Sequence, residues 1–164
     1  IPSSVGESFG SIYFITSGDK LSLFEIKNDA DISHREISSL PIECNLITDF
    51  SGVVYISGVS QNRTFNLLRY NGNSIEEAYL LDDSESEISS MMQFKNNLYI
   101  GCLNGDIYKF DGTSLHLDGS INGAPGIMKT IGSNMYILSR NSSSFYVHNG
   151  SSIKELDIES NIVN

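Results

Sequence analysis

Apolar residues in this chain recur in short runs, and four of these runs are centred on a tyrosine. The runs read SIYFITSG, VVYISG, NLYIGC and NMYILS, and their tyrosines, about 40 residues apart, are Tyr13, Tyr55, Tyr99 and Tyr136. An apolar residue also stands eight positions before each tyrosine, as Val5, Ile47, Met91 and Met128. Apolar runs of this length, bounded by Ser, Gly and Asn, are typical of β-strands. Each repeat is therefore expected to begin with a strand, a tight turn and a second strand.

Two further strand-like segments follow each tyrosine strand. The third segments read LSLFEI, TFNLLRY, DIYKF and SFYVH, and the fourth read HREISSL, EEAYLL, LHLDGSI and IKELDI. Nearly the same turn joins them in three repeats: YNGNSI at 70–75, FDGTSL at 110–115 and HNGSSI at 148–153. Asn-Gly and Asp-Gly accept positive φ, which predicts two-residue hairpin turns with both central residues in that conformation. The first repeat has a weaker turn at 27–30.

Four short antiparallel strands every 40 or so residues resemble the blades of a β-propeller. The predicted fold is all-β, a β-propeller with four blades of four antiparallel strands, at approximately 1–41, 42–83, 84–122 and 123–160, and a fifth starting at 161. The four tyrosines should then occupy equivalent positions in successive sheets, with Ile12, Val54, Leu98 and Met135 facing the opposite way. The repeats are loosely kelch-like or WD40-like. The chain has no Trp and no Gly-Gly pair, so no functional residue is carried over from either family.

Two segments fit the repeat less well. Ser84 and Glu87 could form a capping box, followed by apolar residues at helical spacing, so 84–95 could be a helix. The alignment of the repeats favours a strand there instead. The first ten residues, with two glycines and three serines, predict a poor strand.

The last seven residues, IESNIVN at 158–164, match the entry to the second blade, IECNLIT at 42–48. We therefore expect 159–164 to be an extended strand that needs a partner, because an isolated edge strand leaves its backbone groups unpaired. Three completions are open. The chain could belong to a larger propeller with further blades, which we favour; its last strand could close a four-bladed ring; or another chain could complete an open half.

Composition supports an all-β domain and narrows the classes of partner that the chain could bind. The chain has 164 residues, with 27 Ser, 20 Ile and 3 Ala, and Ser and β-branched residues disfavour helices. The net charge of −10 weighs against binding to nucleic acid or to an anionic membrane surface. No run of apolar residues is long enough to span a bilayer.

Two kinds of loop are candidate partner-binding sites. The first is the acidic run between the second and third blades, with Asp82, Asp83, Glu85 and Glu87, which could face a basic partner, bind Ca²⁺ weakly or be a solvated linker. The second is the set of loops between second and third strands, where Arg63 and Arg140 are scarce positive charges. Ordinary turn chemistry explains the other Asn, Gly and Ser residues of these loops.

The search for catalytic and metal-binding patterns is negative. The sequence has no nucleophile elbow and no phosphate-binding glycine motif, and its histidines, His34, His116 and His148, lack partners at metal-ligand spacing. We expect no cofactor, no metal and satisfied histidine rings. The two cysteines, Cys44 and Cys102, lie in apolar stretches and are expected to be buried thiols.

The compartment stays open. Sequons occur at Asn62, Asn141 and Asn149, but roughly three are expected by chance in a chain this rich in Asn, Ser and Thr. Few cysteines and the absence of a signal-like start slightly favour an intracellular protein, and secretion is not excluded.

These observations favour a non-catalytic scaffold for protein–protein interactions, a propeller module within a larger protein or assembly. One alternative, suggested by the Asn- and Ser-rich loops, is an extracellular or surface recognition module for a glycan or receptor. Such a site should repeat an aromatic residue and an acidic or amide residue at one loop position of every blade, and these loops do not. A third is a fragment of a propeller hydrolase whose catalytic groups lie in other blades.

Overall fold

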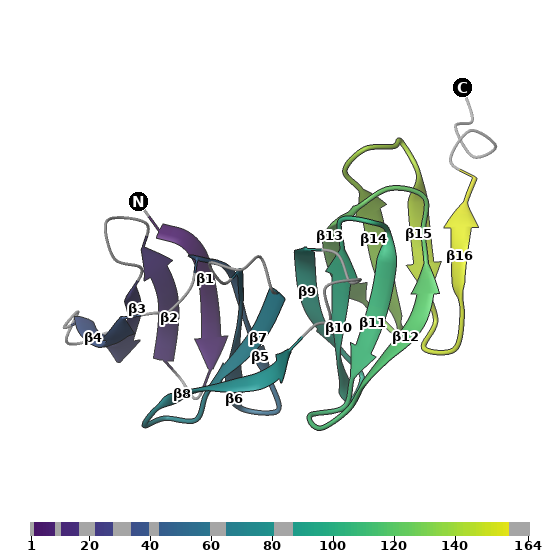
Figure 1. The fold of residues 1–164 in the computed structure, drawn as a ribbon. Helices are drawn as coiled ribbons and strands as arrows, with labels where there is room; N and C mark the ends of the chain where they lie inside the picture. Colours follow the sequence, from purple (N-terminus) through teal and green to yellow (C-terminus); the bar gives the residue numbers. More distant parts are fainter. Residues whose placement is uncertain are drawn as a thin grey trace. The chain divides into compact units, whose positions relative to one another are not determined.

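The computed structural model describes residues 2–8, 11–16, 22–27, 34–39, 43–59, 65–80 and 87–157. These residues form sixteen strands in four antiparallel sheets, each of four strands in chain order (Figure 1). The chain divides into two compact units, Ile1–Glu85 and Ser86–Asn164, each with two of the sheets. The predicted four sheets of four strands are thus confirmed. Among the described residues there is no helix that could cross a membrane.

The first unit begins with a sheet of β1 (Pro2–Ser8), β2 (Ser11–Thr16), β3 (Ser22–Lys27) and β4 (His34–Ser39). Its second sheet holds β5 (Glu43–Phe50), β6 (Val53–Val59), β7 (Phe65–Tyr70) and β8 (Ile75–Leu80). The N-terminal segment, expected to be a poor strand, forms β1, which pairs with β2 with a register shift between Pro2 and Ser4. A Cβ on Gly6 would lie 3.4 Å from the Ile47 side chain, which is an ordinary van der Waals contact.

The second unit begins with a sheet of β9 (Ile88–Phe94), β10 (Asn97–Cys102), β11 (Asp106–Phe110) and β12 (Leu115–Ser120). The other sheet holds β13 (Pro125–Ile131), β14 (Asn134–Ser139), β15 (Phe145–His148) and β16 (Ile153–Leu156). Within the segment 84–95, residues 88–94 form β9 and pair with β10, so they are a strand and not a helix, whereas 84–86 lie outside the described residues. In this unit the first strands of the two sheets, β9 and β13, lie side by side (Figure 1).

The four tyrosines are equivalent, as predicted. Each is the third residue of the second strand of its sheet, in β2, β6, β10 and β14. Because side chains alternate along a strand, the residue before each tyrosine faces the other side of the sheet. Both faces of these sheets therefore carry apolar side chains, which suits sheets stacked face to face.

Each unit has a core between its two sheets. In the first unit Tyr13 and Ile15 of β2 pack against the second sheet, including Ile47, Val54 and Ile56. In the second unit the first sheet contributes Phe94, Tyr99 and Ile107, and the second contributes Met128, Met135, Ile137 and Tyr146. The same rule holds in both units: the tyrosine face of one sheet packs on the opposite face of the next. Full burial of such side chains stabilises by about 1.5–3 kcal/mol each.

The repeated turns lie between third and fourth strands, as predicted, but their geometry differs from the prediction. Positive φ occurs at the glycine alone of each pair, +97° at Gly72, +104° at Gly112 and +97° at Gly150. The preceding residue accepts hydrogen bonds through its side chain: Asn71 Oδ1 from the N–H groups of Asn73 and Ser74, at 2.9 and 3.0 Å. Asp111 and Asn149 do the same in their turns. The Asn or Asp therefore replaces a backbone acceptor.

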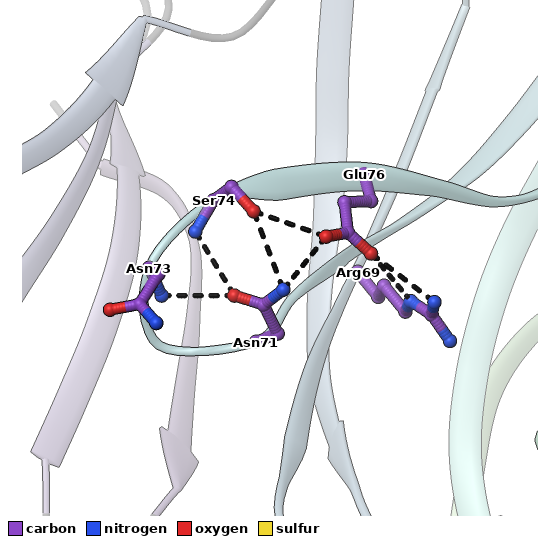
Figure 2. A network of polar contacts seen from close by, with 5 residues as sticks. All are labelled: Arg69, Asn71, Asn73, Ser74 and Glu76. Carbon is purple, nitrogen blue, oxygen red and sulfur yellow. Dashed lines mark hydrogen bonds and ion pairs between the residues drawn. The ribbon is translucent and has the colours of Figure 1, made fainter.

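In the first unit this turn is tied to the strands beside it (Figure 2). The Asn71 side-chain amide donates to Glu76 Oε1 at 2.8 Å, and Arg69 donates to Glu76 Oε2 through Nε and Nη2 at 3.3 and 3.2 Å. The predicted kind of turn, with two residues that both have positive φ, is found instead between β5 and β6, where φ is +53° at Ser51 and +75° at Gly52.

Cys44 and Cys102 are buried thiols, as expected, and no disulfide joins them. Burial raises the pKa of the Cys44 thiol to about 12. At neutral pH this thiol is protonated and behaves as a small apolar group.

Candidate interaction surface at the loop edge of the second unit

In an antiparallel meander, loops that join second to third strands lie at the same edge as the connections to the next sheet. In the second unit this edge consists of Glu87, Leu103–Gly105, Ile121–Ala124 and Arg140–Ser144; we call it the loop edge. Backbone hydrogen bonds hold it together: Leu103 N–H to Glu87 O at 2.8 Å, Ile121 N–H to Gly105 O at 2.9 Å and Arg140 N–H to Ala124 O at 2.8 Å. The loop edge is therefore a framework and not a set of independent loops.

Arg140 lies across this edge and links the two sheets of the unit. Its Nη2 donates to the Ser89 carbonyl oxygen in β9 at 3.2 Å. Gly126 makes room for it, because a Cβ on Gly126 would overlap the Arg140 side chain. The arginine nevertheless remains exposed. A guanidinium has several N–H donors, so it can hold this carbonyl and still present donors to a partner.

Beneath Arg140 two serines fasten β9 to β13. Ser89 Oγ and Ser90 Oγ both donate to the Pro125 carbonyl oxygen, at 2.7 and 2.9 Å, and both serines are buried. The close approach also needs Gly101, since a Cβ there would lie 2.6 Å from the Pro125 side chain. The sequence prediction missed these residues because Ser and Gly in strands carry no signal of a contact 35 positions away.

The predicted partner-binding residues divide into two groups. Arg140 and Glu87 lie on the loop edge, and Glu87 is half-buried at the entry to β9. Asp82, Asp83, Glu85 and Arg63 lie outside the described residues. Leu103 also lies on this edge and is 42% exposed. No cluster of His, Cys, Asp and Glu among the described residues could hold a metal ion.

The loop between β10 and β11 shows the turn chemistry expected of these loops. Asn104 Oδ1 accepts the Asp106 N–H at 3.0 Å, and the Asn104 amide donates to Asp106 Oδ2 at 2.7 Å. Ser120 Oγ donates to the other Asp106 oxygen at 2.6 Å. These polar side chains stabilise the loop backbone on which Leu103 stands.

A histidine–aspartate pair lies in the same unit, and of the two only the histidine is buried. His148 is 0% exposed, and its Nε2 lies 2.6 Å from Asp118 Oδ2. The Gly150 N–H donates to Nδ1 at 2.7 Å, so Nε2 carries the proton and donates to the carboxylate. Burial raises the pKa of the neighbouring Tyr99 hydroxyl to about 12, and the Asp118 carboxylate adds to the rise. With both ring nitrogens engaged, the pair holds the turn at 149–152 onto β12, as expected for a satisfied histidine.

Comparison with known proteins identifies the fold. No protein-family model matches the sequence, and no curated protein matches it. Among solved structures, the WD40 β-propeller domain of Doa1 superposes with a TM-score of 0.68 at 12% identity, over 99% of this chain and 55% of that one. The fold is that of a β-propeller.

Two further solved structures also superpose on this chain. A chain of a nidogen/laminin complex superposes with a TM-score of 0.71 at 13% identity, over 95% of this chain and 62% of that one. The computationally designed Ika4 protein superposes with a TM-score of 0.60 at 12% identity, over 96% and 91%. This propeller chain thus spans 91% of the designed protein but less than two thirds of the two natural ones.

Proposed function

We propose that this chain is a non-catalytic β-propeller module that binds protein partners within a larger protein or assembly, with blades at about 1–41, 42–83, 84–122 and 123–160. The observation that carries the proposal is the loop edge of the second unit. It is a hydrogen-bonded framework that presents the exposed side chains of Arg140 and Leu103, with the half-buried Glu87 on the same edge. Arginine is enriched in protein interfaces and among the residues that contribute most to binding.

Two further points support this function. A similar fold occurs in a chain of a nidogen/laminin complex, which is an assembly of proteins. The His148–Asp118 pair, in contrast, gives no support to a hydrolase, because hydrogen bonds to Gly150 and Asp118 engage both ring nitrogens. A general base needs a nitrogen that can take a proton from substrate.

Site-specific photo-crosslinking tests the loop edge. A photoreactive phenylalanine at Leu103 should crosslink to a defined protein partner in cells of the source organism. The matched control is the same residue at Leu117, which is 57% exposed on β12, away from the loop edge. Arg140→Glu should abolish the Leu103 crosslink. A crosslinked partner that is unchanged by Arg140→Glu, or captured equally from Leu117, would contradict the proposal.

A further inference from the structure

The turn at 149–152 contains a pair of residues that can react with each other. An asparagine followed by glycine can cyclise: the glycine nitrogen attacks the asparagine Cγ, ammonia leaves and a succinimide forms. Glycine favours this step because it has no Cβ to hinder the approach of its nitrogen. The described residues hold two such pairs in equivalent turns, Asn71-Gly72 and Asn149-Gly150. Their surroundings differ.

The Gly150 N–H is hydrogen bonded to a base. It donates to His148 Nδ1 at 2.7 Å, and His148 Nε2 lies 2.6 Å from Asp118 Oδ2. Because Nε2 carries the ring proton, Nδ1 is the basic nitrogen, and the proton that it can accept is that of Gly150. The Asp118 carboxylate stabilises the imidazolium that this transfer creates. The buried ring thus serves no external substrate, but it is aligned with a reactive group of its own chain.

A cation holds the other end of the same peptide group. Lys95 Nζ donates to the Asn149 carbonyl oxygen at 2.6 Å. When the Gly150 nitrogen loses its proton, the negative charge is shared with this oxygen by resonance. The ammonium group therefore stabilises the nucleophilic form of the nitrogen. Lys95 approaches so closely that a Cβ on Gly150 would overlap its side chain, so the glycine leaves the room that the lysine occupies.

The side chain under attack is also held in place. Attack on Cγ puts negative charge on Asn149 Oδ1, which already accepts the N–H groups of Ser151 and Ser152 at 2.8 and 3.0 Å. Donors that face an oxygen on which charge develops lower the energy of the transition state. The turn therefore combines a base, a cation and a site for the oxyanion.

The equivalent turn of the first unit has only the last of these features. Asn71 Oδ1 accepts two N–H groups in the same way. Tyr70 stands in the place of His148, and its hydroxyl donates to the Gly72 carbonyl oxygen at 2.7 Å. Among the described residues, no histidine or lysine is hydrogen bonded to the Asn71-Gly72 peptide group. This turn is therefore a control within the same chain.

We propose that Asn149-Gly150 is a site of self-catalysed deamidation, with His148 as the catalytic base. His148 Nδ1 takes the Gly150 proton as the nitrogen bonds to Asn149 Cγ. The imidazolium then gives up that proton, and Nδ2 leaves with it as ammonia. Water opens the succinimide to aspartate or isoaspartate, so the net reaction converts an amide and water into a carboxylic acid and ammonia. This modification goes beyond the proposed function and uses no residue of the loop edge.

Incubation of the 164-residue chain in heavy-oxygen water at neutral pH tests the proposal. The heavy oxygen marks succinimides that open during the incubation, and peptide mapping by mass spectrometry measures each site. Asn149 should react at least about tenfold faster than Asn71, since a positioned general base contributes about 100-fold or more. Asn149 should also react faster in the folded chain than in concentrated urea, whereas Asn71 should not.

His148→Asn is the decisive variant, because its side-chain oxygen can accept the Gly150 N–H but cannot take the proton. The Asn149 rate should fall at least about tenfold, while the Asn71 rate in the same sample stays unchanged. Circular dichroism checks folding. Lys95→Met, at an exposed position, replaces this variant if it does not fold, and should also slow Asn149 alone.

Three results would overturn the proposal. They are equal rates at Asn149 and Asn71 in the wild type, a slower Asn149 reaction in the folded chain than in urea, and an Asn149 rate that the folded variant leaves unchanged. The second would show that the turn protects Asn149 instead of activating it. None of them affects the photo-crosslinking test of the loop edge.

Discussion

At the residue scale, one turn is built three times with the same hydrogen bonds. Asn71, Asp111 and Asn149 each accept two backbone N–H groups with a side-chain oxygen, and the next residue is a glycine with φ near +100°. The Asn or Asp supplies the acceptor and the glycine supplies the backbone conformation. The two contributions can be tested separately.

Gly72→Ala tests the backbone contribution. No atom lies within 4 Å of an added Cβ, so strain from φ of +97° is the cost of the substitution. The free energy of unfolding should fall by about 1 kcal/mol, and Gly112→Val should lower it by at least as much, because a β-branched residue tolerates positive φ poorly. Urea denaturation measures both. Asn73→Ala, in the same turn without positive φ, is the control and should be nearly neutral; an equal effect there would contradict the interpretation.

Asp111 makes its turn sensitive to acid. Hydrogen bonds from Ser114 and Thr113 lower the pKa of the Asp111 carboxyl from 3.8 to about 2. A carboxyl whose pKa is lower in the folded state stabilises above its unfolded pKa, and this stabilisation is lost as the pH falls from about 4 to about 2. Asp111→Asn, which copies the turns at 71 and 149, should remove this pH dependence. Urea denaturation of both proteins at pH 5 and at pH 2 measures this effect. The difference between their free energies of unfolding should be smaller at pH 2 than at pH 5, and a difference that is the same at both pH values would contradict the assignment.

At the scale of elements, a few polar side chains join the first strands of the two sheets in the second unit. In the second unit Ser89 and Ser90 donate to one carbonyl oxygen, that of Pro125, and Arg140 donates to the carbonyl of Ser89. These contacts fix the spacing of β9 and β13, on which the loop edge stands. The position of the loop edge therefore depends on the buried hydroxyl groups of Ser89 and Ser90 and on the Pro125 carbonyl beneath it.

The double variant Ser89→Ala/Ser90→Ala tests this connection. Each single substitution leaves the Pro125 carbonyl with one hydroxyl donor, whereas the double variant removes both. Loss of donors to a buried acceptor costs about 1–3 kcal/mol, so the double variant should lose more stability than the sum of the singles. Thermal and urea unfolding of the wild type, the two single variants and the double variant provide the cycle, with Ser143→Ala at an exposed position of the same edge as a control. Strict additivity would show that the serines act independently.

At the scale of the whole molecule, both units follow one packing rule, in which the tyrosine face of the first sheet packs on the opposite face of the second. The two units therefore repeat the same kind of core with different residues.

Much of the fold was predictable from the sequence because it is written in local patterns. The spacing of Tyr13, Tyr55, Tyr99 and Tyr136 predicted the equivalent second strands, and the Asn-Gly and Asp-Gly pairs predicted the hairpins between third and fourth strands. Both signals depend on residues within one or two strands of each other. The propeller fold follows from their repetition, and the strand at 88–94 follows from alignment with its counterparts.

The tertiary structure decided which of these patterns are buried and what the polar residues do. Tyr99 and Tyr136 have the same local sequence context, yet one is core and the other lies on a half-buried face, because burial depends on the sheet that packs against it. Arg140 reaches Ser89, 51 positions away, through space left by Gly126. The sequence by itself determined the strands and turns of this protein, since those depend on neighbouring residues. Its cores and candidate site depend on contacts between sheets about 40 residues apart, which no local pattern specifies.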